Sequence, residues 1–181
     1  MPRFVVLLRG VNVGKGKRVP MADFKALLEG LGYTSVITLL NSGNAVFTSS
    51  GRAAAKHAAA IATAVERTLG VTTPAIVKSA AELSAIVEAS PIIPSEFEHS
   101  RYLVAFAPDE AALDAIGPLQ SLAQAPERFV VSRLAAYLYC PNGVLQSRVG
   151  EALLGKAGKG VTTRNWATVL KLAAQAGTRA A

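Results

Sequence analysis

Val36-Ile-Thr-Leu-Leu-Asn-Ser-Gly-Asn-Ala-Val-Phe-Thr48 consists of two short apolar segments with turn residues between them. Asn and Gly tolerate a positive φ, so residues 41–44 predict a tight turn. The flanking residues 36–40 and 45–48 then predict two strands that this turn joins.

The chain on either side of this strand pair predicts a complete small fold. An unbroken apolar run at residues 4–8 predicts a first strand, and residues 73–78 predict a fourth. Apolar residues recur at i, i+3 and i+4 in residues 20–31 and 52–69, which indicates two amphipathic helices. The order β-α-β-β-α-β is that of a split β-α-β, or ferredoxin-like, unit.

The rest of the chain repeats this order in part. Ser79 and Glu82 form a capping box that starts a further helix. Residues 91–98 contain two prolines and read as a connector. Strands are predicted at residues 101–107, 129–132 and 135–140, and helices after residue 108 and at residues 144–154.

The last helix is expected to start after Thr162 or Thr163, either of which is a good N-cap, so no fourth strand is expected in the second half. We therefore expect an α+β fold with two ferredoxin-like halves, whose antiparallel sheets pack into one compact unit. Residues 1–90 form the first half and residues 91–181 the second.

Composition indicates a folded protein without membrane segments. The chain has 181 residues, of which 51% are hydrophobic and 17% charged, so it can bury a core. No apolar run approaches the roughly 20 residues that span a bilayer. The single cysteine, Cys140, cannot form an internal disulfide and is expected to be a buried, inert thiol. A cytoplasmic location and no membrane partner are expected.

The net charge of +7 is unevenly distributed. Residues 1–80 hold ten Lys or Arg against three Asp or Glu, residues 81–125 hold one against seven, and residues 126–181 hold eight against two. This layout could focus an anionic ligand on one face. Alternatively, acidic and basic segments pair between subunits, and the oligomeric state stays open.

A glycine-spaced basic loop follows the first predicted strand. Residues 9–18, Arg-Gly-Val-Asn-Val-Gly-Lys-Gly-Lys-Arg, hold four positive side chains and three glycines, which makes a candidate anion-binding corner. The loop matches neither a P-loop nor a G-x-G-x-x-G motif. The alternative is that its glycines only shape a solvated loop.

This loop is expected to lie beside the turn at residues 41–44. In the ferredoxin-like strand order 4-1-3-2, the first and second strands end at the same edge of the sheet. The resulting patch would suit a phosphate or carboxylate. Its candidate ligand-binding residues are Arg9, Asn12, Lys15, Lys17, Asn41, Ser42 and Asn44. Taken alone, residues 41–44 also fit an ordinary hairpin turn.

A third polar cluster, residues 162–166, is placed at the start of the last predicted helix. There Arg164 and Asn165 would add charge and hydrogen bonds to unpaired N–H groups, so they join the candidate ligand-binding residues. The alternative is a helix cap beside a core residue, Trp166.

The sequence contains no recognisable catalytic or metal-binding pattern. His57 and His99 are isolated and expected to be solvated, and the carboxylates near the basic loop are scattered on predicted helices. No metal is expected, and the catalytic residues and cofactors are unknown. Nucleic-acid binding fits the charge, but no aromatic residues alternate with the basic ones to form a stacking platform.

Several of these motifs together resemble a known family. The residues are 8–14 (Leu-Arg-Gly-Val-Asn-Val-Gly), 19–21 (Val-Pro-Met), 41–44 (Asn-Ser-Gly-Asn) with Val46 and Phe47, and 163–166 (Thr-Arg-Asn-Trp) with Val169 and Leu170. In this order they resemble the bacterial domain-of-unknown-function 1697 family, over nearly the whole chain. The resemblance implies an α+β fold with ferredoxin-like halves and one shared site, but no activity.

The leading functional hypothesis is an uncharacterised cytoplasmic protein that binds a small anionic, phosphate-containing ligand at the polar loop cluster. Nucleic-acid binding through basic patches is one alternative. An enzyme acting on a nucleotide-like substrate, with Asn and Arg side chains stabilising the transition state, is another.

Overall fold

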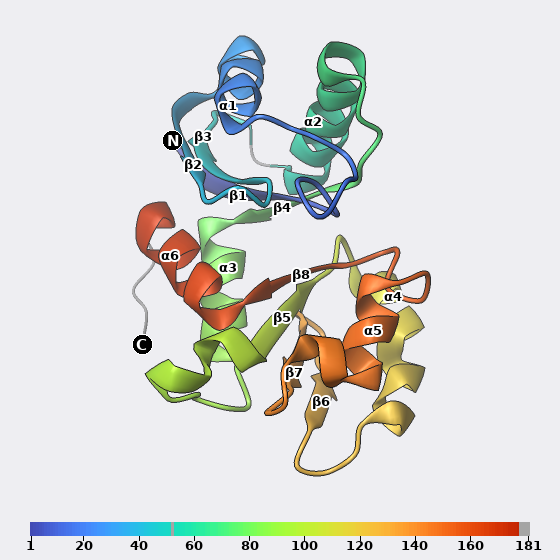
Figure 1. Cartoon of the computed structure of the whole chain (residues 1–181). Coiled ribbons are helices and arrows are strands. Elements are labelled where there is room, and N and C mark those ends of the chain that lie inside the picture. Colours follow the sequence, from blue (N-terminus) through green and yellow to red (C-terminus); the bar gives the residue numbers. More distant parts are fainter. Residues whose placement is uncertain (52, 178–181) are drawn as a thin grey trace. The chain divides into compact units, whose positions relative to one another are not determined.

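The computed structural model describes residues 1–51 and 53–177 and is an α+β fold with two four-stranded antiparallel sheets (Figure 1). The chain forms two compact units. The first is Met1–Ser84 together with the segment that starts at Leu172, and the second is Ala85–Lys171. No helix among the described residues is long and apolar enough to cross a bilayer.

The first unit has the predicted β-α-β-β-α-β order. Its elements are β1 (Arg3–Leu8), α1 (Met21–Gly30), β2 (Thr34–Leu39), β3 (Asn44–Thr48), α2 (Ala54–Leu69) and β4 (Ala75–Ser79). The sheet order is β2-β3-β1-β4, with every neighbouring pair antiparallel. The expected ferredoxin-like arrangement is therefore confirmed, and β1 and β2 end at the same edge.

One face of this sheet forms a core with α1 and α2. Alternate residues of β1, Phe4, Val6 and Leu8, belong to this core. The alternation is that of a strand with one face on a helical layer. Helix α1 contributes Phe24 and α2 contributes Ile61, each fully buried.

His57 lies in this core and not in solvent, which corrects the expectation from the sequence. Its side chain is 8% exposed, and His57 Nδ1 shares a hydrogen bond of 2.9 Å with the Tyr33 hydroxyl. His57 is four residues before Ile61 and eight before Val65, so it falls on the buried stripe of α2. Tyr33 stacks on Phe47, and His57 lies edge-on to both rings.

The second unit carries the elements that follow β4. They are α3 (Ala80–Glu88), η1 (Glu96–Arg101), β5 (Tyr102–Phe106), α4 (Glu110–Ile116), η2 (Gly117–Leu122), β6 (Arg128–Val131), β7 (Ala136–Tyr139), η3 (Val144–Gln146), α5 (Arg148–Leu154), β8 (Thr162–Asn165) and α6 (Trp166–Ala176). Helix α3 begins in the first unit and α6 ends there. Cys140 is buried as expected, and its Sγ donates a hydrogen bond to the Arg101 carbonyl.

Strand β8 was not expected from the sequence. It pairs antiparallel with β5, so the second sheet has the order β6-β7-β5-β8, which matches the first. The prediction of an N-cap at Thr162 or Thr163 is wrong, because both residues lie in this strand. Asn165 caps α6 instead, since its Oδ1 accepts a hydrogen bond from Thr168 N.

The pairing of the last strand with the first also corresponds between the two halves. Lys78 of β4 pairs with Val5 of β1, and Arg164 of β8 pairs with Val104 of β5. The residue after each cation starts a helix: Ser79 accepts from Glu82 N as the predicted capping box, and Asn165 caps α6. Each half is thus a β-α-β-β-α-β unit followed by a capped helix.

The last turns of α6 contribute to the first unit. Arg3 Nη1, at the start of β1, donates a hydrogen bond of 2.8 Å to the Gln175 carbonyl. The two residues are 172 positions apart.

Candidate anion-binding site

The loop after β1 and the turn between β2 and β3 lie together, as the strand order predicts. Leu8 N donates to the Gly43 carbonyl at 2.9 Å, and Asn12 Nδ2 donates to the Asn41 carbonyl at 2.8 Å. We call residues 9–18 the basic loop and residues 41–44 the turn.

Gly43 permits this close approach. A Cβ built on it would lie 2.7 Å from Leu8 Cβ and 2.7 Å from Val11 Cγ2, and its φ is +77°. Real Cβ atoms essentially never come this close, and a positive φ is itself costly for a residue with a Cβ. The contact between loop and turn therefore requires glycine here.

Asn12 closes the basic loop. Its Nδ2 donates to the Val19 carbonyl as well as to the Asn41 carbonyl, and its Oδ1 accepts from Val19 N. Its own backbone N–H donates to the Lys17 carbonyl at 2.7 Å. Both amide hydrogens are therefore used within the protein. Asn12 shapes the site and does not offer these donors to a ligand.

The backbone of the basic loop alternates in φ sign. Gly10, Asn12 and Gly14 have φ values of +64°, +57° and +56°, while Val11 and Val13 between them keep negative values. Such alternation is typical of a nest, in which successive peptide N–H groups converge on an anion. Within the described residues, the N–H groups of Val13, Gly14 and Lys15 make no hydrogen bond.

The cations of the loop divide into tethered and untethered side chains. Lys17 Nζ donates to the Thr72 carbonyl, and Arg18 Nη2 donates to the Gly14 carbonyl at 2.8 Å. Lys15 is exposed and has no side-chain partner in the part of the chain that the structure describes. Arg9 is half-buried. Its backbone N–H donates to the Pro74 carbonyl, and its carbonyl accepts from Thr73 Oγ1.

The turn residues also differ in what they can offer. Asn44 is fully buried, and its Nδ2 donates to the Leu39 carbonyl and to Ser42 Oγ. Asn41 is exposed, and its Nδ2 makes no hydrogen bond among the described residues. Asn44 therefore stabilises the turn, whereas Asn41 presents a donor beside the loop.

Residues 72–74 form a third wall that sequence reasoning missed. Thr73 Oγ1 donates to the Arg9 carbonyl at 2.6 Å, and Arg9 N donates to the Pro74 carbonyl at 3.1 Å. The predicted topology already implied this position, because β4 is antiparallel to β1 and must begin where β1 ends. The predicted strand, residues 73–78, already included two of these three residues.

The remaining candidate residues, Arg164 and Asn165, belong to the second unit. Arg164 is 8% exposed and donates to Thr162 Oγ1 and to the Thr163 carbonyl, both at 2.8 Å. Burial lowers the pKa of its guanidinium to about 10. Asn165 is occupied as the cap of α6. Both side chains are thus engaged in β8 and its junction with α6.

Metal ligands do not gather at the site. Among residues 1–51 and 53–177, no group of three or more His, Cys, Asp or Glu side chains could hold a metal ion. The site consists of amides, cations and backbone N–H groups, which suits an anion.

Comparison with known proteins identifies a family and a fold. Residues 1–137 match the family model described as "Protein of unknown function (DUF1697)". The structure resembles that of the conserved bacterial protein SP0830 from Streptococcus pneumoniae, with a TM-score of 0.78 and 23% sequence identity over 97% of this chain and 98% of that one. This likeness shows a shared fold. No curated protein matches the sequence.

Proposed function

The chain belongs to the DUF1697 family of proteins of unknown function, and from its own residues we propose that the basic loop binds a small anion that carries a phosphate group. The observation that carries this proposal is the alternating φ at residues 10–14, beside Lys15, together with neighbouring N–H groups that have no partner among the described residues. Nests with an adjacent cation are a recurrent way of binding phosphate.

The available donors favour a phosphate over a carboxylate. The donors left over in the loop and the turn are the peptide N–H groups of residues 13–15, the Lys15 ammonium and the Asn41 amide, counted among the described residues. A phosphate has three terminal oxygens with which to accept them, whereas a carboxylate has two. Lys15 adds a point charge that a phosphate binds well.

The state of the loop's charged side chains favours a small ligand over a nucleic acid. Two of the loop's cations, Lys17 and Arg18, already donate to main-chain carbonyls. These bonds leave the charges in place but hold both side chains at the loop, so the side chains are less able to follow a run of phosphates, which is what supports nucleic-acid binding. The loop and turn contain neither a histidine nor a carboxylate, so the proposal is for binding and assigns no reaction.

Isothermal titration of the full chain at low salt with inorganic phosphate, adenosine monophosphate and ribose 5-phosphate tests the proposal. A ligand at about 100 times its Kd should also raise the free energy of unfolding by about 2.7 kcal/mol. Lys15→Gln should weaken binding, and Lys25→Gln should not, because Lys25 is an exposed lysine of α1 outside the site.

Two outcomes would contradict the proposal. One is that none of the three phosphates binds the wild-type chain. The other is that Lys15→Gln and Gly14→Ala, which strains the nest, bind as the wild type does. Binding of mixed-sequence oligonucleotides alone, with an affinity that falls steeply with salt, would favour the nucleic-acid alternative.

A further inference from the structure

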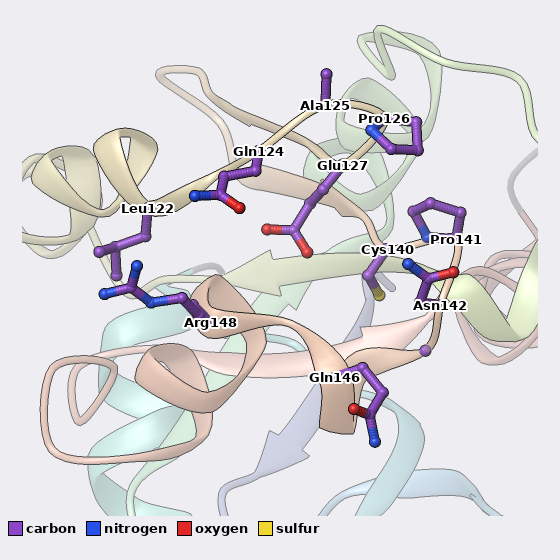
Figure 2. Close-up of a pocket in the computed structure, with 11 residues that line it drawn as sticks. Leu122, Gln124, Ala125, Pro126, Glu127, Cys140, Pro141, Asn142, Gln146 and Arg148 are labelled. Atoms are coloured by element: carbon purple, nitrogen blue, oxygen red, sulfur yellow. The ribbon is translucent and has the colours of Figure 1, made fainter.

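A cavity of about 230 Å³ lies in the second unit, where β6 begins and β7 ends. Its walls are the segment before β6, the turn after β7, η3 and the first residue of α5 (Figure 2). Cys140, 1% exposed, is among its lining residues. All of these residues lie within Ala85–Lys171, so the cavity is distinct from the basic loop of the first unit.

The internal repeat gives Glu127 a counterpart in the first half. Arg128 pairs with Tyr139 in the second half as Thr34 pairs with Thr48 in the first. Strand β2 has a register shift between Thr34 and Ile37, so the correspondence is counted from the pair at the start of each strand. Counted from there, Glu127 is the counterpart of Tyr33. In the first half, Tyr33 forms a hydrogen-bonded pair with His57, and both residues are 8% exposed.

Two charged side chains of opposite sign line the cavity. Figure 2 shows the Glu127 carboxylate pointing toward the middle of the pocket and the Arg148 guanidinium at another side, next to Leu122. The Glu127 charge reaches the thiol of Cys140, where it adds to burial in raising the pKa. Among the described residues, neither Glu127 nor Arg148 takes part in an ion pair.

Carboxamides complete the polar lining. Gln124 lies beside Glu127, and Asn142 lies near Cys140. The backbone N–H of Glu127 donates to the main-chain carbonyl of Gln124 at 2.9 Å, and this bond fixes the turn that carries both side chains. Carboxamides can both donate and accept hydrogen bonds, so they favour a polar guest.

We propose that this cavity binds a free α-amino acid with a small or polar side chain. Glu127 would accept hydrogen bonds from the ammonium, Arg148 would bind the carboxylate through its planar fork, and Gln124 and Asn142 would contact the side chain. A zwitterionic amino acid carries a positive group for Glu127 and a negative group for Arg148. It would thus pair both charged side chains, which form no ion pair of their own among the described residues. The cavity is smaller than the pockets that hold drug-sized ligands, which agrees with so small a guest.

Isothermal titration of the full chain with the free L-amino acids tests this proposal. Concentrations up to about 10 mM would detect a Kd of about 1 mM. We expect at least one polar amino acid to bind. Its N-acetyl derivative, which lacks the ammonium, and its C-terminal amide, which lacks the carboxylate, should each bind more weakly by about tenfold or more.

Matched variants localise the binding. Glu127→Gln and Arg148→Gln each remove one pole of the cavity and should abolish amino-acid binding. Glu110→Gln and Arg133→Gln remove an exposed ion pair elsewhere in the same unit and should leave it unchanged. Because Glu127 is half-buried and Arg148 exposed, the variants should keep the unliganded Tm of the wild type.

The proposal is wrong if no amino acid binds, or if both pocket variants bind as the wild type does. It is also wrong if the N-acetyl derivative binds as tightly as the free amino acid, because the carboxylate of Glu127 would then have no role.

Discussion

The side-chain amide of Asn12 donates a hydrogen bond of 2.8 Å to the main-chain oxygen of Asn41, 29 residues further along the chain. The same nitrogen donates to the Val19 carbonyl. One side chain therefore holds both the end of the basic loop and the neighbouring turn. Loss of this amide should disturb the site even if a ligand never touches it.

Asn12→Ala should lower the free energy of unfolding by about 2 kcal/mol, because carbonyls and an N–H group lose their partner in a half-buried position and because alanine tolerates the positive φ of residue 12 less well than asparagine. Urea denaturation followed by circular dichroism measures the change. Asn12→Asp keeps the acceptor for Val19 N but places a second carboxylate oxygen against the Val19 and Asn41 carbonyls, so it should not restore the stability of the wild type. A loss below about 0.5 kcal/mol for Asn12→Ala, within the range of ordinary surface substitutions, would show that Asn12 does not organise the loop.

Gly43→Ala should be the more harmful of two glycine substitutions near the site. Its Cβ would meet Leu8 and Val11 at 2.7 Å in a backbone with φ +77°, so strain and overpacking add to about 3 kcal/mol or more. Gly10→Ala is the matched control, since φ is +64° there but no atom lies within 4 Å of the built Cβ. It should cost only about 1–2 kcal/mol of left-handed strain. Equal losses in thermal unfolding would contradict the close approach at Gly43.

The correspondence of the two halves predicts equal effects at their helix caps. Ser79→Ala and Asn165→Ala each remove the side chain that caps the helix after the last strand, and each should cost about 1 kcal/mol of stability. Asn165→Asp keeps the accepting oxygen and should retain most of the stability. Denaturant titration of the variants checks this. If the Asn165→Ala protein is as stable as the wild type, the Asn165 side chain does not stabilise α6 as its cap.

Stability should decrease at alkaline pH through Cys140. Burial, reinforced by the charge of Glu127, raises the pKa of this thiol from 9.0 to about 11. Between these two values the unfolded chain has released the proton and the folded chain has kept it, so unfolding is favoured as the pH rises. The stability of the wild type relative to Cys140→Ala should therefore fall between about pH 9 and pH 11, by an amount on the order of 2 kcal/mol.

Denaturant titrations of wild type and Cys140→Ala at several pH values provide the measurement. A difference between the two proteins that does not change over this range would mean that the thiol ionises as freely in the folded state as in the unfolded one.

Hydrophobic periodicity and turn chemistry were sufficient for the first sheet. The apolar run of β1 and the Asn-Ser-Gly-Asn turn after β2 are local signals, and the strand order then placed the basic loop beside that turn. The burial of His57 was missed because its neighbours on α2 are alanines, although its spacing to Ile61 matched the buried face.

Other features depend on partners that sequence patterns do not reveal. Strand β8 is four residues long and polar, so only its pairing with β5 identifies it. The part that Asn12 plays depends on carbonyls of Val19 and Asn41, and backbone acceptors leave no trace in residue types. The cavity beside Glu127 is lined by residues from 122 to 148, and their meeting depends on tertiary packing that local patterns do not encode.

The hydrogen bond from Arg3 to the Gln175 carbonyl has a consequence for biosynthesis. At elongation rates of about 5–20 residues per second, Gln175 is added roughly 10 to 30 s after Arg3. The nascent chain can pair the strands of its first sheet early, yet that unit waits for residues from Leu172 onward to be complete. A ribosome that stalls before this segment would release a sheet without its final helical contact, which is the kind of species that chaperones and proteases recognise.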